Sequence, residues 1–102
     1  MPTIKNLTED IAAVVGLPED TNTYGIGIAA MYSGMPYLCY DTKHSIGWDI
    51  KIHIPPGSWS IVGWSDELTG GQIYELGLTV REFKESLRSH GIDRALIIKK
   101  EK

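Results

Sequence analysis

The sequence predicts an α+β fold, a mostly antiparallel sheet of about five strands with helices packed on one face. Several short segments alternate apolar and polar residues or are rich in β-branched and aromatic residues, and Gly- and Pro-containing turns separate them. One later segment carries helix signals at both of its ends. The expected order is helix, four strands, helix, strand, which favours an antiparallel sheet with its helices on one side.

Length and composition indicate one ordinary globular domain, residues 1–102, because 102 residues suffice for one hydrophobic core and not for two. A net charge of -3 argues against binding of a nucleic acid polymer, which needs a basic surplus. The single cysteine, Cys39, cannot form an internal disulfide, as expected in a reducing compartment. No apolar run reaches the roughly 18 residues of a membrane span. We therefore expect a soluble, cytoplasmic protein without membrane contact.

Residues 7–15 predict a short first helix. Asn6 or Thr8 would cap its start, and Gly16 would end it. The apolar residues of this segment recur at helical spacing, which favours a helix packed on the sheet.

Residues 23–32 and 37–42 predict two strands joined by a turn at residues 33–36. Gly25 and Gly27 form a Gly-x-Gly pair within the first strand. A dinucleotide-binding loop needs a third glycine and an immediately following helix, and both are missing here. The glycines instead indicate a bulge or a close approach by another group.

Residues 48–64 form the clearest pattern and predict a β-hairpin. Three isoleucines alternate with polar residues from 49 to 54, and Pro55-Pro56-Gly57 supplies the turn. A four-residue loop fixes the facing pairs, which are Ile54 and Trp59, Ile52 and Ile61, and Ile50 and Gly63. These residues form the predicted core face.

The opposite face of this hairpin would place Asp49, Lys51 and His53 beside Val62 and Trp64. Two interpretations remain open. A helix or the chain termini cover the apolar pair, or the face is exposed and stacks on a planar ligand or docks on a protein.

Residues 79–90 predict the second helix, with a capping box formed by Thr79 and Glu82 and an end at Gly91. Arg81 and Glu85 are four residues apart and should pair on its exposed side. Residues 72–76 predict one helical turn, after an irregular segment at 65–71, and residues 94–99 predict the last strand.

The segments 54–69, 83–92 and 95–100 resemble a group of small phage and prophage proteins. The shared features are a proline-glycine turn, an aromatic strand, and a helix with a closing serine, leucine, basic residue and glycine pattern. The resemblance covers residues 46–100 and departs after Thr69, where Gly70-Gly71 replaces a more helical acidic run. It implies a phage accessory gene whose product binds host components, including nucleotide immune signals. It assigns no site residue.

Neither a metal site nor a catalytic site is predicted. His44, Asp49 and His53 lie near one hairpin, but Asp49 and His53 would be about 13 Å apart along a strand, too far to share an ion. No histidine lies at a spacing from Cys39 that indicates a catalytic pair. Asp41 and Asp49 could act as paired carboxylates only if the fold brought them together, which the sequence does not indicate. We therefore expect a protein that is not an enzyme and has no cofactor, with a small hydrolase as a less favoured interpretation.

The leading prediction is a non-enzymatic phage accessory protein that binds a nucleotide-like ligand and so sequesters a host immune signal. Aromatic residues would stack on a base, and cations would contact phosphate. The candidate ligand-binding residues are Tyr40, Trp48, Lys51, His53, Trp64 and Arg81. The alternative is a protein-protein interaction module that inhibits or scaffolds a host or phage partner. A homo-oligomer would fit either role, because a small fold has little room for a deep pocket within one subunit.

Overall fold

The fold is taken from a computed structural model, which describes residues 3–17, 27–32, 35–41, 48–55 and 57–101. Side-chain burial is described within 3–17, 54–55 and 57–101. The elements in order are β1 (Thr3–Asn6), β2 (Ile11–Val15), β3 (Gly27–Tyr32), β4 (Met35–Asp41), β5 (Trp48–His53), β6 (Ser58–Trp64), α1 (Gly70–Glu75), α2 (Val80–Ser89) and β7 (Leu96–Glu101). The predicted start of the 23–32 strand, residues 33–34 of the predicted turn, and His44 lie outside the described residues.

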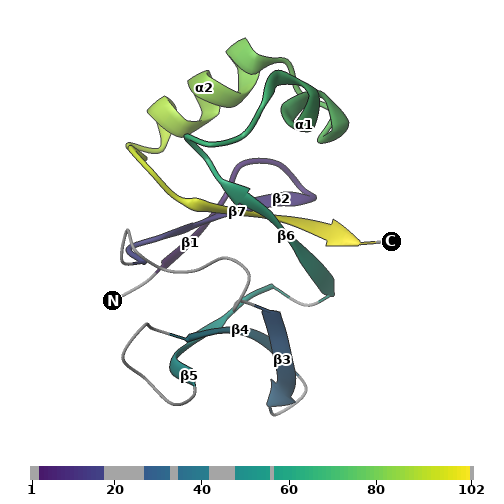
Figure 1. Cartoon of the computed structure of the whole chain (residues 1–102), viewed down its shortest axis with the longest axis vertical. Coiled ribbons are helices and arrows are strands. Elements are labelled where there is room, and N and C mark those ends of the chain that lie inside the picture. The colour runs from purple at the N-terminus through teal and green to yellow at the C-terminus, as the bar shows by residue number, and fades with distance from the viewer. Residues whose placement is uncertain (1–2, 18–26, 33–34, 42–47, 56, 102) are drawn as a thin grey trace.

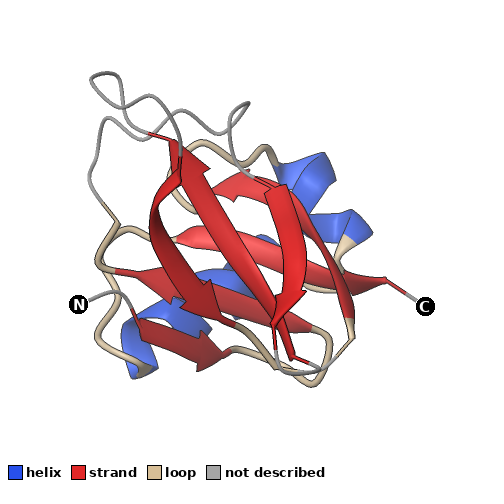
Figure 2. Cartoon of the chain, turned by 90° about the horizontal axis from the view of Figure 1, so that it is seen from below, coloured by secondary structure: helices blue, strands red, loops and turns tan. Residues whose placement is uncertain are grey.

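The α+β class is confirmed, and the described strands form two antiparallel sheets. A four-stranded sheet has the order β1-β2-β7-β6, and a three-stranded sheet has the order β3-β4-β5. Figure 1 shows α1 and α2 on one side of the four-stranded sheet and the three-stranded sheet on the other. In Figure 2 the strands of the smaller sheet run across those of the larger one. The single sheet of about five strands that the sequence predicted is thus replaced by a layered arrangement.

The predicted helix at residues 7–15 is wrong, because most of this segment is the strand β2. The backbone amides of Leu7 and Thr8 donate to the carbonyl of Ile11, at 2.9 and 3.1 Å, and so close a tight turn after β1. β2 then pairs with β1 on one side and β7 on the other. A central strand covered on both faces is apolar throughout, and such a run has no period that separates it from a buried helix.

The predicted hairpin of residues 48–64 is also wrong. β5 pairs with β4, whereas β6 pairs with β7, so the chain leaves one sheet and enters the other between residues 54 and 58. Ile54 is buried at this crossing, and the indole N–H of Trp59 donates to the Pro55 carbonyl at 2.9 Å. The alternation of polar and apolar residues in β5 defines a strand, but it does not identify the neighbouring strand.

The two faces of the four-stranded sheet bury separate apolar clusters. The cluster away from the helices contains Ala12, Val14, Ile54, Trp59, Trp64, Leu96 and Ile98. The cluster beneath the helices contains Ile11, Ala13, Ile73, Phe83, Ile92, Ala95 and Ile97. Successive residues of β2 and β7 alternate between the two clusters, as a strand with two covered faces requires. Ile54 and Trp59 belong to the core as predicted, whereas the side chains of Ile50 and Ile52 are outside the described part.

The helix α2 has the ends that the sequence predicted. The Glu82 amide donates to the Thr79 hydroxyl at 3.1 Å, and the Thr79 amide donates to the Glu82 carboxylate at 3.0 Å. This second bond, from the backbone, holds the pKa of Glu82 below its ordinary value. Gly91 follows the helix with φ +67°, as a left-handed residue after a helix should. Lys5 of β1 donates to the carbonyl of His90 at 2.8 Å and so ties the first strand to the end of α2.

The helix α1 includes the helical turn predicted at residues 72–76 and begins earlier, at Gly70. Its start is a second capping box, in which Thr69 and Gln72 exchange hydrogen bonds of 2.9 and 3.2 Å. The pattern Thr-x-x-Gln is a capping signal in the sequence, but the two glycines that follow Thr69 lower helix propensity and conceal it. No described helix is long and apolar enough to cross a membrane.

Candidate functional site

The structure divides the six candidate residues among different layers, and four of them lie in the three-stranded sheet. Tyr40 belongs to β4, and the other three belong to β5, the outer strand of this sheet. The β5 candidates Trp48, Lys51 and His53 stand opposite Asp41, Cys39 and Tyr37 of β4. These three positions are alternate pairs of the β4–β5 ladder and therefore share one face of the sheet. Tyr40 pairs with Ile50 at an intervening position, so it lies on the opposite face. The pairing of β4 with β5 thus brings Trp48, Lys51 and His53 together and separates Tyr40 from them.

An irregularity in β5 determines where Trp48 lies. The register shifts between the rung of Tyr40 with Ile50 and the rung of Asp41 with Trp48, so β5 carries one extra residue there. In an unbroken ladder Trp48 would lie on the opposite face of β5 from Lys51. The extra residue instead places Trp48 on the same face as Lys51 and His53.

Trp64 is a core residue, not an exposed ligand contact. It is only 5% exposed and belongs to the cluster on the face of the sheet away from the helices. The sequence placed it on the face opposite Trp59, but a bulge between Ile61 and Gly63 shifts the register, so both tryptophans share one face. Val62, the extra residue, packs against the other cluster beneath the helices. The structure thus favours the interpretation in which the chain itself covers Val62 and Trp64.

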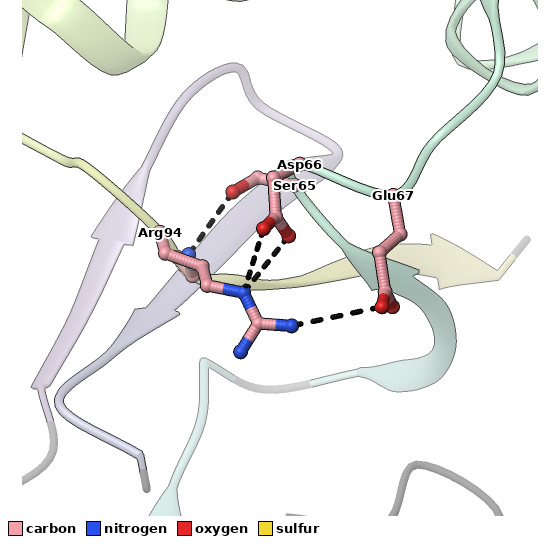
Figure 3. A network of polar contacts seen from close by, with 5 residues as sticks. Ser65, Asp66, Glu67 and Arg94 are labelled. Carbon is pink, nitrogen blue, oxygen red and sulfur yellow. Dashed lines mark hydrogen bonds and ion pairs between the residues drawn. The ribbon is translucent and has the colours of Figure 1, made fainter. Parts of the chain in front are cut away.

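Arg94 lies over the ring of Trp64. It also joins a polar network that the sequence did not reveal (Figure 3). Its Nε donates to both carboxylate oxygens of Asp66, at 2.9 and 3.0 Å, and a terminal nitrogen lies 3.8 Å from Glu67. Ser65 also accepts a bond of 3.0 Å from the amide of Ala95. The network joins the end of β6 to the start of β7 and is structural. Because 28 residues separate Asp66 from Arg94, no local pattern could predict it.

Arg81 lies on α2, in the helical layer, and does not join the other candidates. Its side chain is 88% exposed and pairs with Glu85 at 3.2 Å, as the spacing predicted. The four-stranded sheet lies between this helix and the sheet that holds Tyr40, Lys51 and His53 (Figure 1). A single ligand on one chain cannot contact Arg81 and those residues together.

The helical layer has a groove that the sequence did not predict. It is a depression of about 420 Å³ between α1, α2 and the segment after β6, with Ile73, Phe83 and Leu87 on its floor. A second depression of about 380 Å³ shares Lys84, Leu87 and Asp93 with the first, so the two are continuous along α2. We call this continuous surface the helix groove.

The described side chains show no constellation for metal binding. No group of three or more His, Cys, Asp or Glu residues is positioned to hold an ion within the part of the chain that the structure describes.

Comparison with known proteins finds no matching family model, no similar curated protein and no similar solved structure. The resemblance to small phage proteins stays a prediction.

Proposed function

We propose that the chain is a non-enzymatic protein that binds a small nucleotide-derived ligand on its three-stranded sheet. Trp48 would stack on the base, while Lys51 and His53 would contact the phosphate groups. Three candidates are removed from the proposed site. Trp64 is buried, Arg81 lies in another layer, and Tyr40 lies on the opposite face of the three-stranded sheet.

The pairing of β4 with β5 is the observation that supports this proposal. The extra residue in β5 places Trp48 on the same face as Lys51 and His53, so this face of the sheet combines an aromatic residue with a cation and an imidazole. Aromatic surface beside cations is the usual composition of sites for nucleotides, because every base has a π-face and every phosphate is an anion. β5 is the outer strand of its sheet, and one of its edges therefore has no partner strand among the described residues.

The resemblance to small phage proteins supports a biological setting for this binding. A phage accessory protein that captures a nucleotide immune signal would act in the host cytoplasm, by stoichiometric sequestration. A second subunit could complete the site, since one edge of a small sheet encloses little of a ligand.

A ligand panel tests the proposal directly. The protein is incubated with cyclic mono- and dinucleotides and with ADP-ribose derivatives, and thermal midpoints and calorimetric heats are measured. At least one compound should raise the midpoint in a saturable way and be recovered unchanged after incubation. Absence of heat across the whole panel at tens of micromolar contradicts nucleotide binding. Conversion of the ligand to a product contradicts the non-enzymatic assignment.

Binding of a protein partner is the second candidate function, and the helix groove favours it. Val80 at the start of α2 lines the groove and is 40% exposed, so an apolar side chain that the chain leaves uncovered adds to the apolar floor. An apolar depression with an exposed apolar side chain at its lining is typical of protein interfaces.

A further inference from the structure

The helix groove combines an apolar floor with charged side chains of both signs. Ile73, Phe83 and Leu87 supply the floor. On the side of α2, Lys84 and Arg88 line the groove, and they are spaced four residues apart on the same face of the helix. The groove therefore offers apolar burial along a row of two positive charges.

These two cations are not neutralised within the described chain. The exposed acid of α2 that could serve them, Glu85, pairs instead with Arg81 at 3.2 Å. Neither Lys84 nor Arg88 forms an ion pair with any residue that the structure describes. Like charges four apart on a helix repel each other. A carboxylate from outside the chain would relieve this repulsion.

Two acidic residues, Asp66 and Asp93, also line the groove. Asp66 is occupied by Arg94, which it accepts through both oxygens. Asp93 is exposed, lines both depressions and has no ion pair among the described residues. The lining of the groove thus contains one uncompensated negative charge besides the two uncompensated positive charges.

We propose that the helix groove binds an acidic amphipathic segment of a protein partner. Apolar side chains of the segment fill the floor over Phe83, its carboxylates pair with Lys84 and Arg88, and a basic residue on its other flank meets Asp93. This inference rests on the second candidate function and is independent of ligand binding by the three-stranded sheet, which lies across the four-stranded sheet from the groove (Figure 1).

The test selects peptides from a phage-displayed random library on the immobilised full-length protein. The best peptides are synthesised with a fluorophore, and their affinity is measured by anisotropy for the native chain and two variants. Lys84→Glu reverses a charge in the groove. It also places a glutamate four residues before Arg88, a favourable helical pair, so the variant keeps its fold. Lys100→Glu is the matched control, because Lys100 lies on β7 with its side chain against Gly57, away from the helices.

Enriched peptides should combine spaced apolar residues with acidic residues on one flank. Their affinity should fall about tenfold with Lys84→Glu, where attraction becomes repulsion, and stay within about twofold with Lys100→Glu. Two results with the peptides overturn the proposal: no enrichment above an unrelated protein, or enriched peptides that bind Lys84→Glu as tightly as the native chain. A native dimer in gel filtration that Lys84→Glu dissociates also overturns it, because the groove then binds a second copy of the chain. None of them bears on the nucleotide panel.

Discussion

The guanidinium group of Arg94 lies 4.2 Å from the centre of the Trp64 ring, and the same group binds Asp66. This contact covers the one tryptophan that a simple hairpin would have exposed. The aromatic residue at the end of β6 therefore stabilises the packing of β6 against β7 and is not free to stack on a ligand.

Replacing Trp64 should destabilise the whole fold. Trp64→Ala removes a large side chain from the core and should lower the free energy of unfolding by about 3–5 kcal/mol. Urea denaturation followed by circular dichroism measures this change. Tyr74→Ala is the control, since Tyr74 is an aromatic residue that is 77% exposed, and its removal should change stability by less than about 0.5 kcal/mol. Equal effects of the two variants would mean that Trp64 is not buried.

Replacing Arg94 should have a smaller effect than replacing Trp64. Arg94→Ala loses the contact with the ring and the pair with a half-exposed carboxylate, and should cost about 1–2 kcal/mol. Asp66→Asn keeps the ring contact, and its cost should be clearly lower. The same urea experiment ranks the variants, and a larger loss for Asp66→Asn than for Arg94→Ala would show that the ion pair, not the ring contact, dominates.

Gly63 should not tolerate a side chain. Its φ is +148°, in a region that other residues rarely adopt, and a Cβ atom there would lie 3.2 Å from a methyl group of Leu68. Gly63→Ala should therefore cost about 1–3 kcal/mol. Gly71→Ala is the matched substitution in α1, where the nearest atom would be 3.9 Å away, and it should instead stabilise the protein by about 0.5–1 kcal/mol. Thermal midpoints that rise for both variants would contradict the bulge.

The capping box of α2 should make part of the stability depend on pH. Its hydrogen bonds lower the pKa of Glu82 in the folded protein from the ordinary value of 4.5. The stability that the ionised Glu82 carboxylate contributes is therefore fully present above pH 4.5. It is lost as the pH falls through the lowered pKa of Glu82 in the folded protein. The stability difference between the native protein and Glu82→Gln should be widest at neutral pH and narrow in acid.

The capping box of α1 supplies the control for this pH effect, because its acceptor is the uncharged side chain of Gln72. Gln72→Ala should lower the thermal midpoint by an amount that does not change over the same pH range. An acid-dependent difference for Gln72→Ala as large as that for Glu82→Gln would assign the pH effect to other groups.

Local signals predicted local structure well. Thr79, Glu82 and Gly91 define both ends of α2 within a span of 13 residues, and the Arg81–Glu85 pair follows from helical spacing alone. Each of these features depends on backbone groups close in sequence. They form regardless of what the helix packs against.

Strand pairing could not be predicted, because it depends on competition between distant segments. β6 could pair with β5 through a short turn, but it pairs instead with β7, whose residues Leu96–Ile98 are buried on both faces. The same limit explains β2, whose continuous apolar run imitates a helical face until β1 and β7 are placed beside it.

The candidate site was divided for the same reason. Lys51 and His53 were correctly placed at alternate positions on one strand, but their neighbour is β4 and not β6. The predicted grouping with Trp64 depended on the hairpin and fails with it. The helix groove combines residues from α1, α2 and the segment around Asp93, so no single stretch of sequence reveals it.

In our proposal the nucleotide binds to the three-stranded sheet and not to the helical layer. Calorimetric titration of the most strongly binding nucleotide against Lys51→Ala and Arg81→Ala tests it, because the sequence placed both cations in one site and the structure separates them. Lys51→Ala should weaken binding about tenfold or more, and Arg81→Ala should leave it within about twofold of the native protein. The opposite order, with Arg81→Ala weak and Lys51→Ala unchanged, would contradict the account.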